Sequence, residues 1–211
     1  MKEEILKYKV DKEKVFLLRN PINIKQTRKG IKPIRLGKDK LKLIFVGRLV
    51  YQKGIDRILH LFINNKNIEL SIVGDGKLKN KLSKKVKDLH IEDNIKFFGE
   101  IVKPYSLIAG SDYFILPSRW EGLPNSVLES LALGTPVLST KHIYALNDFK
   151  KNISNKSIQL FNNIKDLSNK ISTLRKRKDY KNPKLRKSLL IENISPATFN
   201  NKFNHIIFKI T

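Results

Sequence analysis

Two cations, Arg48 and Lys53, follow directly on an apolar segment of the chain. The segment, residues 41–47, reads as a buried strand, and its last residue, Gly47, lets a backbone pass close to a ligand. In doubly wound sheets, ligands bind at the carboxyl ends of the strands. Arginine offers a planar fork of donors and lysine a point charge, so together they suit a diphosphate. The competing interpretation is two solvated surface cations.

Two carboxylates, Glu121 and Glu129, stand eight residues apart in the segment 117–137, which follows an apolar run and opens a helical pattern. A carboxylate can accept two hydroxyl hydrogen bonds at once, so the pair suits a polyhydroxylated ligand. Backbone N–H groups near residues 123–126 would be unpaired donors at a helix start, which is a ready anion site. Two other interpretations are open: residues 126–129 fit a capping box that Glu129 closes, and Glu121 is a solvated loop residue.

Other kinds of chemistry find little support in the sequence. The chain has no cysteine, which removes disulfides, thiolate metal sites and cysteine nucleophiles. Its four histidines have no metal-ligand spacing, and there is no G-x-S-x-G, Walker A or H-E-x-x-H motif. The sequence GDG at 74–76 follows a predicted strand, but it is weak evidence for a ligand site because such a sequence is common in ordinary strand-to-helix turns. We therefore expect no bound metal.

Short apolar runs alternate with amphipathic segments through the middle of the chain, which predicts an α/β fold with a parallel sheet covered on both faces. A helix is expected to end at the C-capping Gly134. Strands are predicted at 14–22, 41–47, 68–74, 95–99, 112–117, 136–139 and 158–161, and helices at 54–64, 77–89, 104–109, 125–133, 164–176 and 199–210.

Taken together, these segments resemble the C-terminal domain of a GT-B glycosyltransferase, of the large retaining family that carries the E-x7-E signature. The matching stretches come in family order and cover about residues 41–140. They are VGRLVYQKGID (46–56), IVGDG (72–76), FFG (97–99), SDYFILPS (111–118) and EGLPNSVLESLALGTPV (121–137). NPI (20–22) also resembles the hinge between the two domains of the family. The resemblance implies a Rossmann-like doubly wound sheet that forms one half of a GT-B fold.

The resemblance also implies roles for single residues. Arg48 and Lys53 match the pair that holds the donor diphosphate and stabilises the departing charge, in place of a metal ion. Glu121 matches the glutamate that contacts the transferred sugar, and these three would form the catalytic set. Glu129 matches the residue that holds the ribose hydroxyls. The remaining donor-binding positions would be Gly47, Gly99, Ile101, Gly122, Leu123, Pro124 and Asn125, with the stretch 99–101 beside the base.

The chain departs from the family pattern in two ways. Residues 141–148 contain no glycine, where the family often has a Gly-rich turn. An N-terminal Rossmann-like domain, which supplies most acceptor contacts, has no counterpart in the sequence. We therefore expect residues 1–24 to be the tail of a missing domain with its hinge, 25–175 a nucleotide-sugar-binding domain, and 176–211 a basic linker with a C-terminal helix. Such a chain alone would have little or no transferase activity.

The net charge of +24 is carried mainly by the flanks of the chain. Residues 1–40 hold 13 basic and 5 acidic side chains, residues 41–140 hold 14 and 10, and residues 141–211 hold 16 and 4. Many of the lysines would serve only solubility. The flanks would also suit an anionic inner membrane surface, where each nearby cation contributes about 1 kcal/mol.

The expected function is transfer of a hexosyl unit from a nucleotide sugar, UDP-linked, to a cell-envelope polysaccharide or glycolipid, with a separately encoded N-terminal domain as partner. Without a signal segment or a long apolar run, we expect a cytoplasmic location. The alternatives are an inactive remnant and a basic binding module for anions such as nucleic acid. Specific nucleic-acid binding is not expected, because the chain shows no known recognition pattern.

Overall fold

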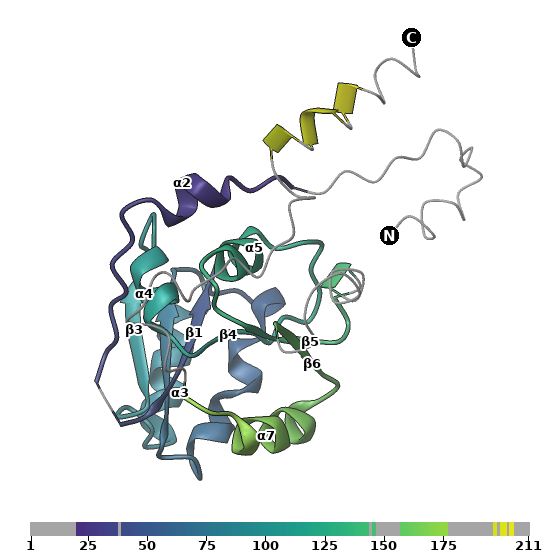
Figure 1. The fold of residues 1–211 in the computed structure, drawn as a ribbon. Coiled ribbons are helices and arrows are strands. Elements are labelled where there is room, and N and C mark those ends of the chain that lie inside the picture. The colour runs from purple at the N-terminus through teal and green to yellow at the C-terminus, as the bar shows by residue number, and fades with distance from the viewer. Residues whose placement is uncertain are drawn as a thin grey trace, which may run out of the picture.

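A computed structural model describes residues 20–37, 39–143, 145–146, 157–176, 196–197, 199–201 and 203–204. A six-stranded parallel sheet lies at the centre of the molecule (Figure 1), in the order β3-β2-β1-β4-β5-β6. The predicted parallel sheet is therefore confirmed. Its strands are β1 (Leu41–Val46), β2 (Ile68–Val73), β3 (Ile95–Gly99), β4 (Tyr113–Leu116), β5 (Val137–Thr140) and β6 (Ile158–Phe161).

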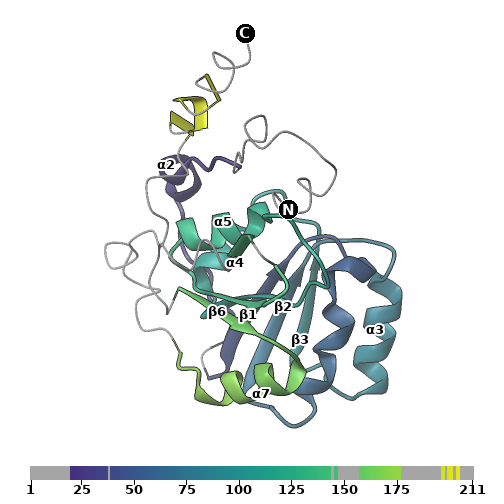
Figure 2. The same cartoon turned by 90° about the vertical axis from the view of Figure 1, so that its right-hand side faces the viewer.

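Helices cover both faces of the sheet. The α-helices whose bounds the structure describes are α2 (Ile24–Arg28), α3 (Lys79–Asp88), α4 (Tyr105–Gly110), α5 (Asn125–Ala132) and α7 (Ile164–Thr173). Figure 2 shows α4 and α5 on one face and α3 on the other, with α2 beside α5. This double cover explains why β1 and β2 are buried over almost their whole length and mostly apolar, the pattern of a strand with no solvent face.

The connection between β1 and β2 is not the α-helix that we predicted for 54–64. It consists of three 3-10 turns, η2 (Tyr51–Lys53), η3 (Ile55–Arg57) and η4 (Leu59–Phe62), closed by bonds such as that from the Ile58 amide to the Ile55 carbonyl, 3.2 Å. The apolar side chains of the segment are still buried, as the spacing predicted. The i, i+3, i+4, i+7 spacing of these apolar residues fits a period of 3.6 residues, so the pattern identified which side chains are buried but not the helix type, which tertiary packing sets here.

The other predicted elements agree with the structure to within one to three residues at their ends, and α5 ends before Gly134 as expected. Of the predicted strand 14–22, residues 14–19 lie outside the described part of the chain and 20–22 are not in a strand. The predicted helix 199–210 lies mainly outside it as well. α2 was not predicted at all; the Asn23 side chain caps it by accepting a bond from the Gln26 amide, 3.0 Å.

A buried ion pair joins the segment after α2 to the sheet. Arg35 donates to both carboxylate oxygens of Asp112, at 2.9 and 3.0 Å, and Asp112 is fully buried. The same carboxylate accepts a bond from the backbone amide of Lys42, 2.8 Å. Because Asp112 leads into β4 and Lys42 lies in β1, these bonds fix the two central strands to each other. No helix in the described residues has the length and apolar character needed to cross a membrane.

Candidate functional site

The strand order reverses between β1 and β4. From β1 the chain adds β2 and β3 on one side of the sheet, and it then returns to place β4 on the other side. The loops that follow β1 and β4 therefore leave the same edge of the sheet in opposite directions, and a crevice at such a point is where doubly wound sheets bind ligands. All four of the charged residues singled out in the sequence follow one or the other of these two strands.

The two loops lie against each other over several residues. Gly54, in the loop after β1, has φ +67°, and a Cβ atom there would lie 2.2 Å from the carbonyl oxygen of Pro117 in the loop after β4. Arg57 donates to that same carbonyl at 3.1 Å, and the Arg119 amide donates to the Gln52 carbonyl at 2.8 Å. The close approach requires a residue without a side chain that tolerates a left-handed conformation, which only glycine provides without strain.

Lys53 and Glu121 meet where these loops touch. The Lys53 Nζ atom is 2.5 Å from Oε1 of Glu121, and only 13% and 9% of the two side chains are exposed. Ser118 donates a second hydrogen bond to the same oxygen, 3.1 Å. Two of the four predicted residues, 68 positions apart in the chain, are thus in direct contact and largely shielded from water.

Arg48 is exposed, and its side chain makes no hydrogen bond or ion pair with any other residue that the structure describes. Gly47, which precedes it, is half-buried. A Cβ atom at Gly47 would lie 3.2 Å from the Phe45 ring and 3.7 Å from Cε of Lys53. A side chain at position 47 would therefore occupy the space beside Lys53, and the role of Gly47 in donor binding stays a prediction.

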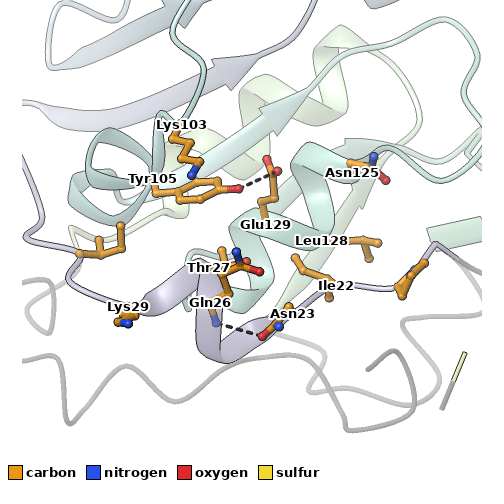
Figure 3. A pocket seen from close by; sticks show the side chains of 12 residues that line it. Ile22, Asn23, Gln26, Thr27, Lys29, Lys103, Tyr105, Asn125, Leu128 and Glu129 are labelled. Atoms are coloured by element: carbon orange, nitrogen blue, oxygen red, sulfur yellow. Dashed lines mark hydrogen bonds between the residues drawn. The ribbon is translucent and has the colours of Figure 1, made fainter. Parts of the chain in front are cut away.

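Glu129 lies on α5 and takes part in a different contact. Its Oε1 atom accepts a hydrogen bond from the hydroxyl of Tyr105, the first residue of α4, at 3.2 Å. The two side chains point toward each other on the wall of a cavity of about 400 Å³ (Figure 3). Burial raises the pKa of Glu129, and the hydrogen bond from Tyr105 partly offsets this.

The capping-box interpretation of Glu129 is wrong. The residue before the first turn of α5 is Pro124, not Ser126, and among the described residues no side chain caps this helix. Proline has no N–H and pre-sets the backbone angle, so the helix begins one residue after it and Glu129 lies beyond the position from which it could close the start. The carboxylate is left facing the cavity.

The cavity lies between the segment after the predicted hinge and α5. Figure 3 shows Asn23, Gln26 and Thr27 of the α2 segment opposite Tyr105 and Glu129. The side chain of Asn20 also donates to Asn125 Oδ1 at 2.9 Å. The cavity is lined by Pro21, Ile22, Asn23, Gln26, Thr27, Lys29, Ile31, Lys103, Tyr105, Asn125, Leu128 and Glu129.

The remaining predicted donor-binding residues lie at the same edge of the sheet, and their roles stay predictions. Gly99 ends β3, and its carbonyl accepts a bond from the Gly74 amide at 2.6 Å. Ile101 and Leu123 are half-buried, Gly122 is exposed and Pro124 is buried. Sequence reasoning missed Tyr105 and Ser118. Both are ordinary polar residues at element ends, and nothing in their spacing marks them as partners of the glutamates.

Comparison with known proteins decides the family. The profile of the family described as Glycosyl transferases group 1 matches residues 26–189 of the chain. The chain belongs to the group 1 glycosyltransferases. It is 40% identical over 107 residues to an uncharacterized glycosyltransferase of Methanocaldococcus jannaschii, a match that covers 49% of this chain and 26% of that protein. It is 29% identical over 144 residues to a Campylobacter jejuni N-acetylgalactosaminyltransferase acting on a diphospho-undecaprenol-linked saccharide, which covers 67% of this chain and 39% of that one.

Solved structures share the fold. A lipopolysaccharide outer core galactosyltransferase, WaaB, superposes with a TM-score of 0.75 at 21% identity, over 100% of this chain and 60% of its own. The Anabaena protein HepE in complex with UDP gives a TM-score of 0.78 at 15% identity, over 99% and 61% of the two chains. The chain therefore has the Rossmann-like fold of one half of a GT-B enzyme. The matches with the Methanocaldococcus and Campylobacter proteins cover less than two fifths of the length of either one.

Proposed function

We propose that this chain is the donor-binding half of a retaining glycosyltransferase, and that its donor is a UDP-linked hexose. The observation that carries the proposal is the contact of Lys53 with Glu121 at the point where the strand order reverses. A cation for the diphosphate and a carboxylate for the sugar stand side by side there, as a sugar joined to a pyrophosphate requires. Membership of the family and the UDP complex of the Anabaena relative support the same donor class.

The chemistry that these residues would perform is stabilisation of a leaving group. During transfer, the bond between the anomeric carbon and the β-phosphate oxygen breaks, and its electron pair stays on the diphosphate. The acceptor oxygen bonds to the anomeric carbon, and its proton passes to the diphosphate oxygen that has left that carbon. Lys53 and Arg48 would face the charge that develops on the diphosphate, where fixed cations lower the barrier most. Lys53 would then exchange part of its contact with Glu121 for the phosphate oxygens.

Glu129 would bind the ribose hydroxyls of the donor from the wall of the cavity. A carboxylate accepts two hydroxyl hydrogen bonds, and the Tyr105 hydroxyl occupies only one of its oxygens. The cavity volume of about 400 Å³ lies within the range of small-molecule sites. We further propose that donor binding needs no metal ion, since the two cations supply the positive charge.

The acceptor would be a cell-envelope polysaccharide or glycolipid. Relatives of the chain include a Rhizobium meliloti glycosyltransferase of lipopolysaccharide core biosynthesis, 33% identical over 96 residues. The acceptor contacts would come mostly from an N-terminal domain, because the chain spans only part of its relatives' length. Transfer would therefore need that second half, whereas donor binding would not.

Donor binding can be tested on the chain as it is. UDP at about 100 times its Kd should raise stability by about 2.7 kcal/mol, which is roughly 5–11 °C in melting temperature for a chain of this size. Arg48→Ala and Glu129→Ala should each remove most of that shift. Lys84→Ala is the matched control for lost positive charge, since Lys84 is exposed on α3. If millimolar UDP and GDP leave the melting temperature unchanged, the proposed function is wrong.

A further inference from the structure

Two large aromatic side chains are exposed next to the site. Tyr51 and Trp120 are 60% and 54% exposed, and their ring centroids are 6.0 Å apart with the planes tilted by 56°. Tyr51 lies in the loop after β1 and Trp120 in the loop after β4, so the rings meet across the reversal of strand order. Exposed aromatic clusters on a protein surface mark a place where something binds.

The rings are held in place by an ordered network. Arg119 donates to both carboxylate oxygens of Asp56, at 2.9 and 2.7 Å, and to the Tyr51 carbonyl at 2.7 Å. The Arg119 guanidinium also lies over the Tyr51 ring, 3.8 Å from its centroid. Gln52 donates to the Trp120 carbonyl at 3.1 Å. The pair is therefore pre-organised, which lowers the entropy that a ligand must overcome.

The aromatic pair and the Lys53–Glu121 contact are carried by the same two loops where these lie against each other. Tyr51 is two residues before Lys53, and Trp120 directly precedes Glu121. The ion pair is shielded while the rings are open to solvent. A ligand on the rings would therefore lie next to a sugar at Glu121, on its outward side.

The chemistry around the rings fits a saccharide better than a protein or a lipid. A pyranose ring presents C–H groups on its faces, which pack on aromatic surfaces, and hydroxyls at its edge, which need polar partners. Gln52, Asp56 and Arg119 place amide, carboxylate and guanidinium groups beside the rings. A protein interface needs about 800 Å² from each partner, far more than two side chains offer. A lipid surface would meet a rim of polar and charged groups instead of an apolar one.

We propose that Tyr51 and Trp120 form an acceptor-side saccharide subsite that packs against a hexopyranose ring of the acceptor glycan. Its assignment to the acceptor rests on the proposed function, because the donor sugar would occupy the shielded position at Glu121. Neither residue belongs to the set that the family resemblance implicates.

Trp120 is the chain's one tryptophan, so its fluorescence reports on this site alone. Maltotriose, triacetylchitotriose and methyl α-galactopyranoside are titrated against the chain, with and without UDP. We expect a saturable change in Trp120 emission with at least one of them, at a Kd on the order of 1 mM. Tyr51→Ala should weaken that binding at least tenfold and leave the thermal shift by UDP unchanged. The control is Ile63→Ala, which shortens an exposed apolar residue at the end of η4 and should change neither.

The possible outcomes separate this proposal from the proposed donor function. If UDP stabilises the chain but no saccharide of the panel changes Trp120 emission, the subsite is refuted and donor binding stands. If Tyr51→Ala binds saccharide as well as the unchanged chain, the subsite is also refuted. A blue shift of Trp120 with phosphatidylglycerol vesicles, without any saccharide response, would assign the rings to a membrane instead. Saccharide binding without any effect of UDP would refute the donor function and, with it, the assignment to the acceptor.

Discussion

Gly54→Ala should separate the two loops that carry the site, and the structure gives the size of the effect. At φ +67° an L-residue costs about 1–2 kcal/mol. The new Cβ atom would also lie 2.2 Å from the Pro117 carbonyl oxygen, which is backbone and cannot rotate away. Overpacking of this kind costs about 1–3 kcal/mol, while the stiffer unfolded chain returns about 0.4–1 kcal/mol. We expect a net loss of about 2–4 kcal/mol.

Gly30→Ala is the matched control for this substitution. Gly30 has φ +70°, and a Cβ atom there would meet nothing within 4 Å, so only the conformational cost of about 1 kcal/mol remains. Urea unfolding of both variants measures the difference, which is the cost of the overlap itself. Because Gly54 positions Lys53, Gly54→Ala should also weaken UDP binding at least tenfold, and Gly30→Ala should not. Equal stabilities of the two variants, or unchanged UDP affinity of Gly54→Ala, would refute the argument that this contact builds the site.

Three further predictions concern charge and metal. Burial raises the pKa of Glu129 in the folded chain. Between the ordinary pKa of a glutamate and this raised pKa, the folded chain holds a proton on Glu129 that the unfolded chain has lost. The free energy of unfolding therefore falls as pH rises from the ordinary pKa to the raised pKa. Glu129→Gln should therefore raise the melting temperature at pH 7, with the gain vanishing near about pH 4; an equal gain at both pH values would contradict this. Asp112→Asn removes the carboxylate charge that pairs with Arg35 and should cost about 3–5 kcal/mol in urea unfolding, whereas exposed Asp88→Asn should cost less than about 0.5 kcal/mol. EDTA should leave the thermal shift by UDP unchanged, and a shift restored only by added Mg²⁺ would show that the two cations do not suffice.

The strands were predictable because buried strands have a mostly apolar composition. β1 and β2 are short apolar runs, and a sheet covered on both faces needs that pattern. The helix type between them was not predictable, because the α-helical spacing of Ile55, Ile58 and Phe62 shows only that these side chains are buried, and tertiary packing overrides the local preference. The interpretation of residues 126–129 as a capping box was wrong because Pro124 sets the start of α5. The local spacing alone could not show this.

In the candidate site, likewise, some features follow from the local sequence and others depend on contacts between residues far apart in the chain. The sequence alone determined that Lys53 and Glu121 follow strands, since apolar runs and helix signals are local properties of the chain. It could not determine that they touch, because that depends on β4 pairing with β1, which the buried Arg35–Asp112 pair and the Gly54–Pro117 approach secure. The contact of Glu129 with Tyr105 likewise exists only because α4 and α5 pack together. Strand order and helix packing are set by contacts between distant residues, and these were decided by the tertiary structure.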